Sequence, residues 1–142
     1  MSNDAERKRT AYLSCVGEQD PISPKTKAQG SLLTCWEYLR RKKGITFDAV
    51  YVVPTSREAN PERNTEQSGE ACLDAIEAEG QEKVACVPLM VRNPANLKEL
   101  YPVMKATLAA IREKELEESG GRPFTIHINV SSGTPQMKQL LP

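Results

Sequence analysis

The sequence predicts an α/β fold in which helices cover both faces of a mainly parallel, doubly wound sheet. Four short apolar runs, rich in β-branched residues, alternate along the chain with segments of helical periodicity. The connections between these runs are long enough to hold the crossover helices that parallel strands need. A length of 142 residues also suits one hydrophobic core, so we expect a single domain over residues 1–142.

The first strand and the first helix are expected near the N-terminus. Residues 1–10 are polar and charged, which predicts a loose lead-in. Residues 11–16 form a compact apolar run that ends at Gly17, as is typical of a strand followed by a loop. Apolar residues then recur with helical spacing from 32 to 39, and the basic run 40–43 follows them. Because cations complement the dipole at a helix C-terminus, we favour that interpretation of the basic run over a nucleic-acid patch.

The same alternation continues along the rest of the chain. Strands are expected at 47–53, 83–88 and 125–130, and helices within 61–79, 97–119 and 134–141. Pro102 either kinks the long helix or marks its first turn, because proline cannot donate the backbone hydrogen bond. Right-handed crossovers from a central first strand give the strand order 3-2-1-4, which makes the sheet Rossmann-like.

Charge and cysteine content narrow the class of protein. Lys and Arg together number 19, as do Asp and Glu, so no global field favours a long nucleic-acid duplex or a membrane surface. No stretch resembles a signal peptide or a membrane span. The cysteines are far apart and form no Cys-x-x-Cys pair, which indicates buried thiols in a reducing compartment: Cys15, Cys35, Cys72 and Cys86. We therefore expect a cytoplasmic protein.

Common cofactor and metal motifs are absent from the expected loops. The first strand is not followed by Gly-x-Gly-x-x-Gly and no acidic residue closes the second, which argues against a dinucleotide-dependent oxidoreductase. A P-loop is also missing. The only histidine, His127, falls on the fourth expected strand, where we interpret it as a core residue in a strand covered on both faces. We therefore expect no metal and no cofactor.

The most informative stretch is the turn that follows the fourth expected strand, residues 131–137 (SSGTPQM). Its three small residues at 131–133 allow backbone to approach a ligand closely. Thr134 suits the N-cap of a helix, and Pro135 suits the first helical position. The stretch therefore reads as a strand-to-helix turn that points a helix N-terminus at a ligand.

This turn predicts a site for a phosphate or a ribose. Pro135 has no N–H, so the amides of Gln136 and Met137 are expected to be free donors at the start of the helix. The strand order places the turn beside the loop 17–25, so that both would line one crevice with residues 55–57 at its margin. The alternative is that the turn merely begins a helix, and both interpretations stay open on this stretch alone.

Residues 16–22 (VGEQDPI) follow the first expected strand, and residues 129–137 (NVSSGTPQM) follow the fourth. Together they resemble the CRISPR-associated Rossmann fold (CARF) domain. Residues 29–33, and 47–53 with the Ser-Arg-Glu at 56–58, are similar as well, so the resemblance touches most of the chain from residue 12 onward. It is closest to the sensor half of the type III CRISPR ancillary ribonucleases.

The resemblance implies a homodimer whose two crevices hold a ring of 3′–5′ linked adenylates, either tetra- or hexa-adenylate. It also implies ligand contacts by residues of both turns: Gly17, Asp20, Ser131, Ser132, Gly133, Thr134, Gln136 and Met137. Lys25, Ser31 and Arg57 are further candidates because of their expected positions.

Two functions follow from the resemblance. The first is a cyclic oligoadenylate sensor that allosterically controls an effector module absent from this chain. The second is a stand-alone, metal-independent ring nuclease, in which a ribose 2′-OH attacks the adjacent phosphorus. Ser132, Thr134 and Lys25 would then position the ring and stabilise the transition state.

Members of the family usually continue with further strands and then an effector such as a HEPN ribonuclease. We therefore expect this chain to be the sensor part of something longer or a minimal stand-alone domain. Arg122 and His127 have the Arg-x4-His spacing of a HEPN site, but Pro123 and the β-branched run place them on a strand. No HEPN site is expected.

Overall fold

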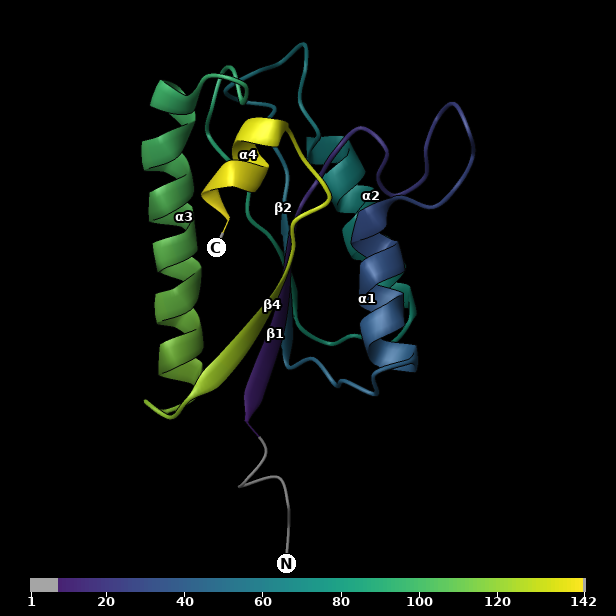
Figure 1. The fold of residues 1–142 in the computed structure, drawn as a ribbon, viewed down its shortest axis with the longest axis vertical. Helices are drawn as coiled ribbons and strands as arrows, with labels where there is room; N and C mark the ends of the chain where they lie inside the picture. Colours follow the sequence, from purple (N-terminus) through teal and green to yellow (C-terminus); the bar gives the residue numbers. More distant parts are fainter. Residues whose placement is uncertain (1–7, 142) are drawn as a thin grey trace, which may run out of the picture.

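The structure, a computed structural model, describes residues 8–141 and alternates strands with helices as the sequence predicts (Figure 1). The elements are β1 (Arg9–Cys15), α1 (Ser31–Arg41), β2 (Ala49–Val53), α2 (Glu66–Ala78), β3 (Val84–Cys86), α3 (Leu97–Glu118), β4 (Phe124–Asn129) and α4 (Pro135–Leu140). No helix in this described part is both long enough and apolar enough to cross a membrane.

The four strands form one sheet in the order β3-β2-β1-β4, which confirms the predicted order. Every pairing is parallel, and β1 lies between β2 and β4, with Ala11 opposite Ala49 on one side and Ile126 on the other. Helices α3 and α4 cover one face of the sheet, whereas α1 and α2 cover the other (Figure 1). The predicted α/β, doubly wound, Rossmann-like arrangement is therefore confirmed.

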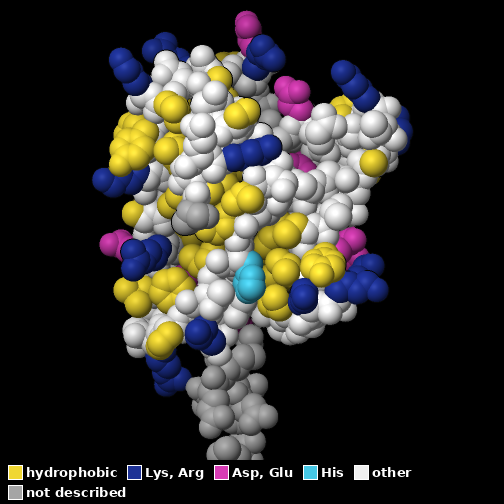
Figure 2. Space-filling view, in the orientation of Figure 1, with side chains coloured by type: hydrophobic (Ala, Val, Ile, Leu, Met, Phe, Trp, Pro, Cys, Tyr) yellow, Lys and Arg dark blue, Asp and Glu magenta, His cyan; other side chains and the backbone are white. Residues whose placement is uncertain are grey.

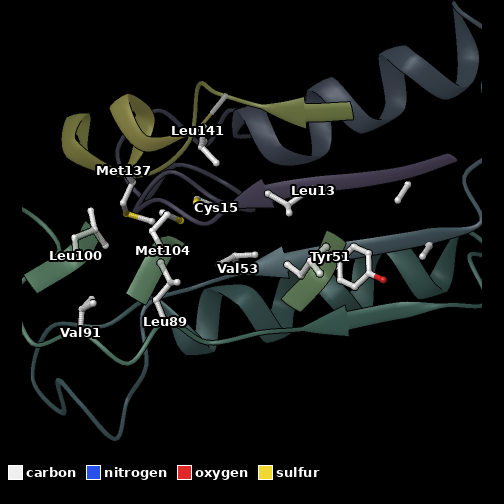
Figure 3. Packing of buried hydrophobic residues seen from close by; sticks show 13 residues of the cluster. Leu13, Cys15, Tyr51, Val53, Leu89, Val91, Leu100, Met104, Met137 and Leu141 are labelled. Atoms are coloured by element: carbon white, nitrogen blue, oxygen red, sulfur yellow. The ribbon is translucent and has the colours of Figure 1, made fainter. Parts of the chain in front are cut away.

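Alternate residues of the central strand enter two separate cores. Leu13 and Cys15 pack with α3 and α4, where Met104 and Met137 lie close to them (Figure 3). Tyr12 packs on the opposite face, among side chains of α1 and α2. A strand that is covered on both faces needs apolar residues at nearly every position, which is the reason for the compact apolar run in the sequence.

The structure corrects the expected start of the first strand and decides between the two interpretations of Pro102. β1 begins at Arg9, two residues before the expected start, so the last residues of the expected lead-in belong to the sheet. Residues 1–7 of that lead-in lie outside the described residues, as does residue 142. Pro102 lies inside one continuous helix, α3, and the preceding residues 97–101 form the first turn of that helix rather than a separate turn.

The fourth strand is less buried than the sequence indicates. β4 is an edge strand, and all of its residues except Asn129 are only partly buried. His127 contacts the Phe47 ring edge-on at 5.8 Å between centroids, yet it reaches the surface (Figure 2, cyan). The expectation of a core histidine in a strand covered on both faces is therefore wrong, because no strand lies on the outer side of β4 in the described sheet.

A buried polar network joins helix α3 to strands β1 and β2. Glu115 has no exposed surface and accepts hydrogen bonds from Arg9 Nε at 2.8 Å and Arg9 Nη2 at 3.1 Å. It also accepts one from the Tyr51 hydroxyl at 2.6 Å. Burial and this bond raise the pKa of Tyr51, so the phenol stays protonated and remains a donor.

Cys15 is expected to resist alkylation in the native protein. Burial raises the pKa of its thiol from 9.0 to about 12, which lowers the thiolate fraction at pH 8 roughly 1,000-fold. We expect iodoacetamide to modify Cys15 at least 100-fold more slowly in buffer than in 8 M urea, as followed by peptide mass spectrometry. The partly exposed Cys35 serves as the internal control. Equal rates at Cys15 in the two solvents would contradict its burial.

Candidate functional site

The turns that follow β1 and β4 are in contact at the point where the strand order reverses. A Cβ atom at Gly17 would lie 3.1 Å from the amide nitrogen of Gly133, so the two backbones approach as closely as glycines allow. Gly133 has φ of 100° and lies over Cys15 and Met137, where a Cβ would be 3.2 to 3.3 Å from their side chains. We call Gly17, Ser31 and residues 131–133 the turn junction.

Asp20 holds the first of these turns against helix α1. Its carboxylate is buried, and its Oδ2 accepts a hydrogen bond from Gly17 N at 2.9 Å. Its Oδ1 accepts one from Leu32 N at 3.2 Å, in the first turn of α1. Both oxygens of Asp20 are thus used by the backbone of the protein, which makes this residue one that positions the junction.

Gly30→Ala is expected to destabilise the fold by about 2–3 kcal/mol. A Cβ at Gly30 would collide with Asp20 Oδ1 and with the carbonyl of Gln19, and neither group can move without breaking the loop. Urea unfolding followed by fluorescence of the single tryptophan measures the change. Gly44→Ala is the matched control, because nothing lies within 4 Å of its Cβ position and only its positive φ costs energy, about 1 kcal/mol. Equal losses in the two variants would contradict the steric argument.

Three serine hydroxyl groups surround the side chain of Asn129 at the turn junction. The Asn129 Oδ1 atom accepts a hydrogen bond from Ser131 N at 3.1 Å. Its Nδ2 atom lies 3.1 Å from Ser14 Oγ, 3.2 Å from Ser31 Oγ and 3.4 Å from Ser132 Oγ. Ser31 and Ser132 also bond to each other, with 2.5 Å between their oxygens. The structure thus brings Ser31 and Ser132 together, although they are 101 residues apart.

Sequence reasoning did not assign roles to Asn129 and Ser14. Both are buried polar residues at the ends of strands that are otherwise apolar. A buried polar side chain needs hydrogen-bond partners, so a serine and an asparagine in apolar runs are the signal that could have predicted this cluster.

The second turn offers free backbone donors, but they are not all the predicted ones. Among residues 8–141, the amides of Ser132, Gly133 and Gln136 have no hydrogen-bond partner. The Met137 amide is not free, because it donates to Thr134 Oγ1 at 3.1 Å. Helix α4 has only six residues, so its dipole adds little to these donors.

Two residues that were expected to contact the ligand are occupied within the protein. The Met137 side chain has no exposed surface and packs in the core beneath Gly133. The Thr134 hydroxyl accepts from the Met137 amide and donates to the Pro94 carbonyl at 3.1 Å, so it joins the turn to the loop before α3. Thr134 is the N-cap that the sequence predicts.

Lys25 and Arg57 do not join this cluster. Lys25 lies in the loop 22–29, which the Ile22–Gln29 bridge closes and which projects away from α4 (Figure 1). No hydrogen bond or ion pair within residues 8–141 connects Lys25 with Ser132 or Thr134. Arg57 is exposed, and its guanidinium lies 3.7 Å from Glu66 and 3.9 Å from Glu70 on α2.

The junction is therefore rich in hydrogen-bond donors and poor in charge. No group of three or more His, Cys, Asp or Glu side chains in the described part of the chain could hold a metal ion. Its polar groups are mostly backbone amides and hydroxyls, which can bind the oxygens of a phosphodiester without a cation.

Comparison with known proteins supports this architecture. No protein-family model matches the chain, and no curated protein matches it significantly. Among solved structures, Csm6 of Enterococcus italicus bound to cyclic hexa-2′-fluoro-hexa-dAMP matches with a TM-score of 0.61 and 18% sequence identity. This likeness in fold agrees with the Rossmann-like sheet that the CARF resemblance implies. The match covers 94% of this chain but only 30% of the Csm6 chain, so the likeness concerns one part of Csm6.

Proposed function

We propose that this chain binds cyclic oligoadenylate at the turn junction and acts as the sensor part of a larger type III CRISPR effector. The observation that carries the proposal is that free backbone amides and serine hydroxyls meet where the turns after β1 and β4 touch. The free amides and the exposed Ser131 hydroxyl can donate to a phosphate oxygen. The likeness in fold to a Csm6 bound to a cyclic hexa-adenylate analogue supports the same ligand class.

A shared site between two copies of the chain fits the size of this ligand. A ring of four or six adenylates carries as many phosphates, whereas one junction offers the free amides of Ser132, Gly133 and Gln136. Two junctions related by a two-fold axis would surround a ring from both sides, which is the homodimer that the CARF resemblance implies. The effector module that responds would lie outside this chain.

Binding without cleavage is better supported than a ring nuclease. The three residues expected to catalyse ring opening are dispersed, because Lys25 lies on the projecting loop and the Thr134 hydroxyl caps α4. Ser132 remains at the junction, but its side chain is buried. A 2′-OH attack needs groups that stabilise the charge developing on phosphorus, and the described junction holds no cation for that role.

Calorimetric titration with cyclic hexa-adenylate is expected to give saturable binding with one ring per two chains. Cyclic tetra-adenylate is titrated in parallel, because the junction does not by itself select a ring size. Linear hexa-adenylate is the control and is expected to bind at least tenfold more weakly, because ordering an open chain costs entropy. Chromatography after incubation is expected to recover intact ring. Absence of binding by both rings would refute the proposal, and linear products would favour the nuclease.

A further inference from the structure

The orientation of the Asn129 amide is set by the backbone. Only an oxygen can accept a hydrogen bond from an N–H group, so the bond from Ser131 N identifies the Oδ1 atom of Asn129. The NH2 group must then face the three serine hydroxyls on the other side. Asn129 is therefore a donor toward the hydroxyl cluster and cannot accept from it.

A count of hydrogen atoms in this cluster leaves one hydroxyl hydrogen unused. Ser14 Oγ donates to the carbonyl of Cys15 at 2.7 Å, so Ser14 accepts one of the two Asn129 N–H groups. Between Ser31 and Ser132, one hydroxyl donates to the other. The hydroxyl that accepts keeps its own hydrogen, and Asn129 cannot take it because its NH2 group faces them.

Exposure decides which serine carries the unused hydrogen. Ser132 is 4% exposed, whereas Ser31 is only partly buried at the start of α1. Ser31 Oγ lies closer to the Asn129 Nδ2 atom than Ser132 Oγ does, at 3.2 Å against 3.4 Å. The consistent arrangement has Ser31 accepting from both Asn129 and Ser132. The hydrogen of Ser31 then points out of the cluster.

We propose that Asn129 is a positioning residue that turns the Ser31 hydroxyl hydrogen outward, so that the junction receives a hydrogen-bond acceptor of the ligand beside Ser31. This inference rests on the proposed function and names the ligand group as a non-bridging phosphate oxygen. The neighbouring free amides of Ser132 and Gly133 are also donors, so the acceptor would be shared between a hydroxyl and the backbone. A ribose hydroxyl acting as donor would find no acceptor at this point.

A double-mutant cycle tests the link between Asn129 and Ser31. Asn129→Asp keeps the acceptor for Ser131 N but replaces the NH2 group by an oxygen, so the Ser31 hydrogen turns inward and a negative charge is added. We expect affinity for cyclic hexa-adenylate to fall about 100-fold in Asn129→Asp and about tenfold in Ser31→Ala. The double variant is expected to lose about 100-fold, because both changes remove the same outward hydrogen. A loss near 1,000-fold would mean independent effects and would overturn the inference.

Ser68→Ala is the matched control, since it removes a serine hydroxyl from the first turn of another helix, α2, and its affinity is expected to stay within threefold of the wild type. If Asn129→Asp fails to fold, Ser31→Ala alone decides, because undiminished affinity in that variant would mean that the outward hydrogen is not used. Failure of the wild-type chain to bind any ring would overturn the proposed function together with the inference. Wild-type binding that Ser31→Ala retains would overturn the inference alone.

Discussion

Ser131→Glu is expected to lower the affinity for cyclic hexa-adenylate at least 100-fold while changing the free energy of unfolding by less than about 0.5 kcal/mol. Ser131 is exposed in the turn after β4, and its hydroxyl has no partner within residues 8–141. Its structural bond is made by the backbone amide to Asn129 Oδ1, which the substitution keeps. A glutamate would therefore place bulk and negative charge beside the free amides without disturbing the fold.

The control for this prediction is Ala110→Glu, which adds the same charge on the exposed surface of α3. Its affinity is expected to change less than twofold, because at physiological salt a distant surface charge is largely screened. Calorimetry gives the affinities, and urea unfolding gives the stabilities. If Ser131→Glu binds the ring as tightly as the control does, the junction is not the ligand site. Thr134 is a poorer position for this test, because its hydroxyl caps α4 and any loss there mixes stability with binding.

Glu115→Ala is expected to reduce the free energy of unfolding by about 3 kcal/mol, at the lower end of the range for breaking a buried ion pair. The substitution removes the acceptor of the Arg9 guanidinium and of the Tyr51 hydroxyl, and it leaves a cavity under α3. Because the Arg9 side chain is 18% exposed, water can partly solvate the released cation, which is why the lower value is expected. The single tryptophan reports the urea transition.

Two further variants separate the causes of that loss. Glu115→Gln keeps the shape and an acceptor for Tyr51, so it is expected to lose less than the alanine variant. Glu113→Ala removes an exposed carboxylate from the same helix and is expected to change stability by less than about 0.5 kcal/mol. A loss below about 1 kcal/mol in Glu115→Ala would show that the network contributes little. Glu115 bonds to Arg9, the first residue of β1, whereas the turn junction follows the last residue of that strand. We therefore expect the folded variant to bind the ring with unchanged affinity.

Much of the candidate site could be predicted because it depends on the sheet. The carboxyl ends of parallel strands lie at one edge, so a central β1 beside β4 brings Gly17 and Gly133 together whatever the side chains of the loops do. Small residues at these positions are visible in the sequence, and they are what permits the contact. The N-cap role of Thr134 is equally local and was predicted.

Other features of these residues depend on neighbours that are distant in sequence, which the local pattern does not show. His127 looked like a core residue from the pattern of its strand, but the edge position of β4 leaves it partly exposed. Met137 looked like a ligand contact, but its side chain fills the space beneath Gly133. Lys25 was placed near the turn by its position after β1, whereas the closed loop 22–29 carries it away.

The sequence by itself determined the alternation of strands and helices, the strand order and the meeting of two glycine-containing turns, because each follows from local periodicity and from the handedness of parallel crossovers. Only the tertiary structure decided which polar groups at that meeting point are free and which are occupied. Hydrogen bonds such as those of Asn129 with Ser31 and of Thr134 with Pro94 join residues far apart in the chain. Their partners are fixed by packing in three dimensions, which no local pattern of residues encodes.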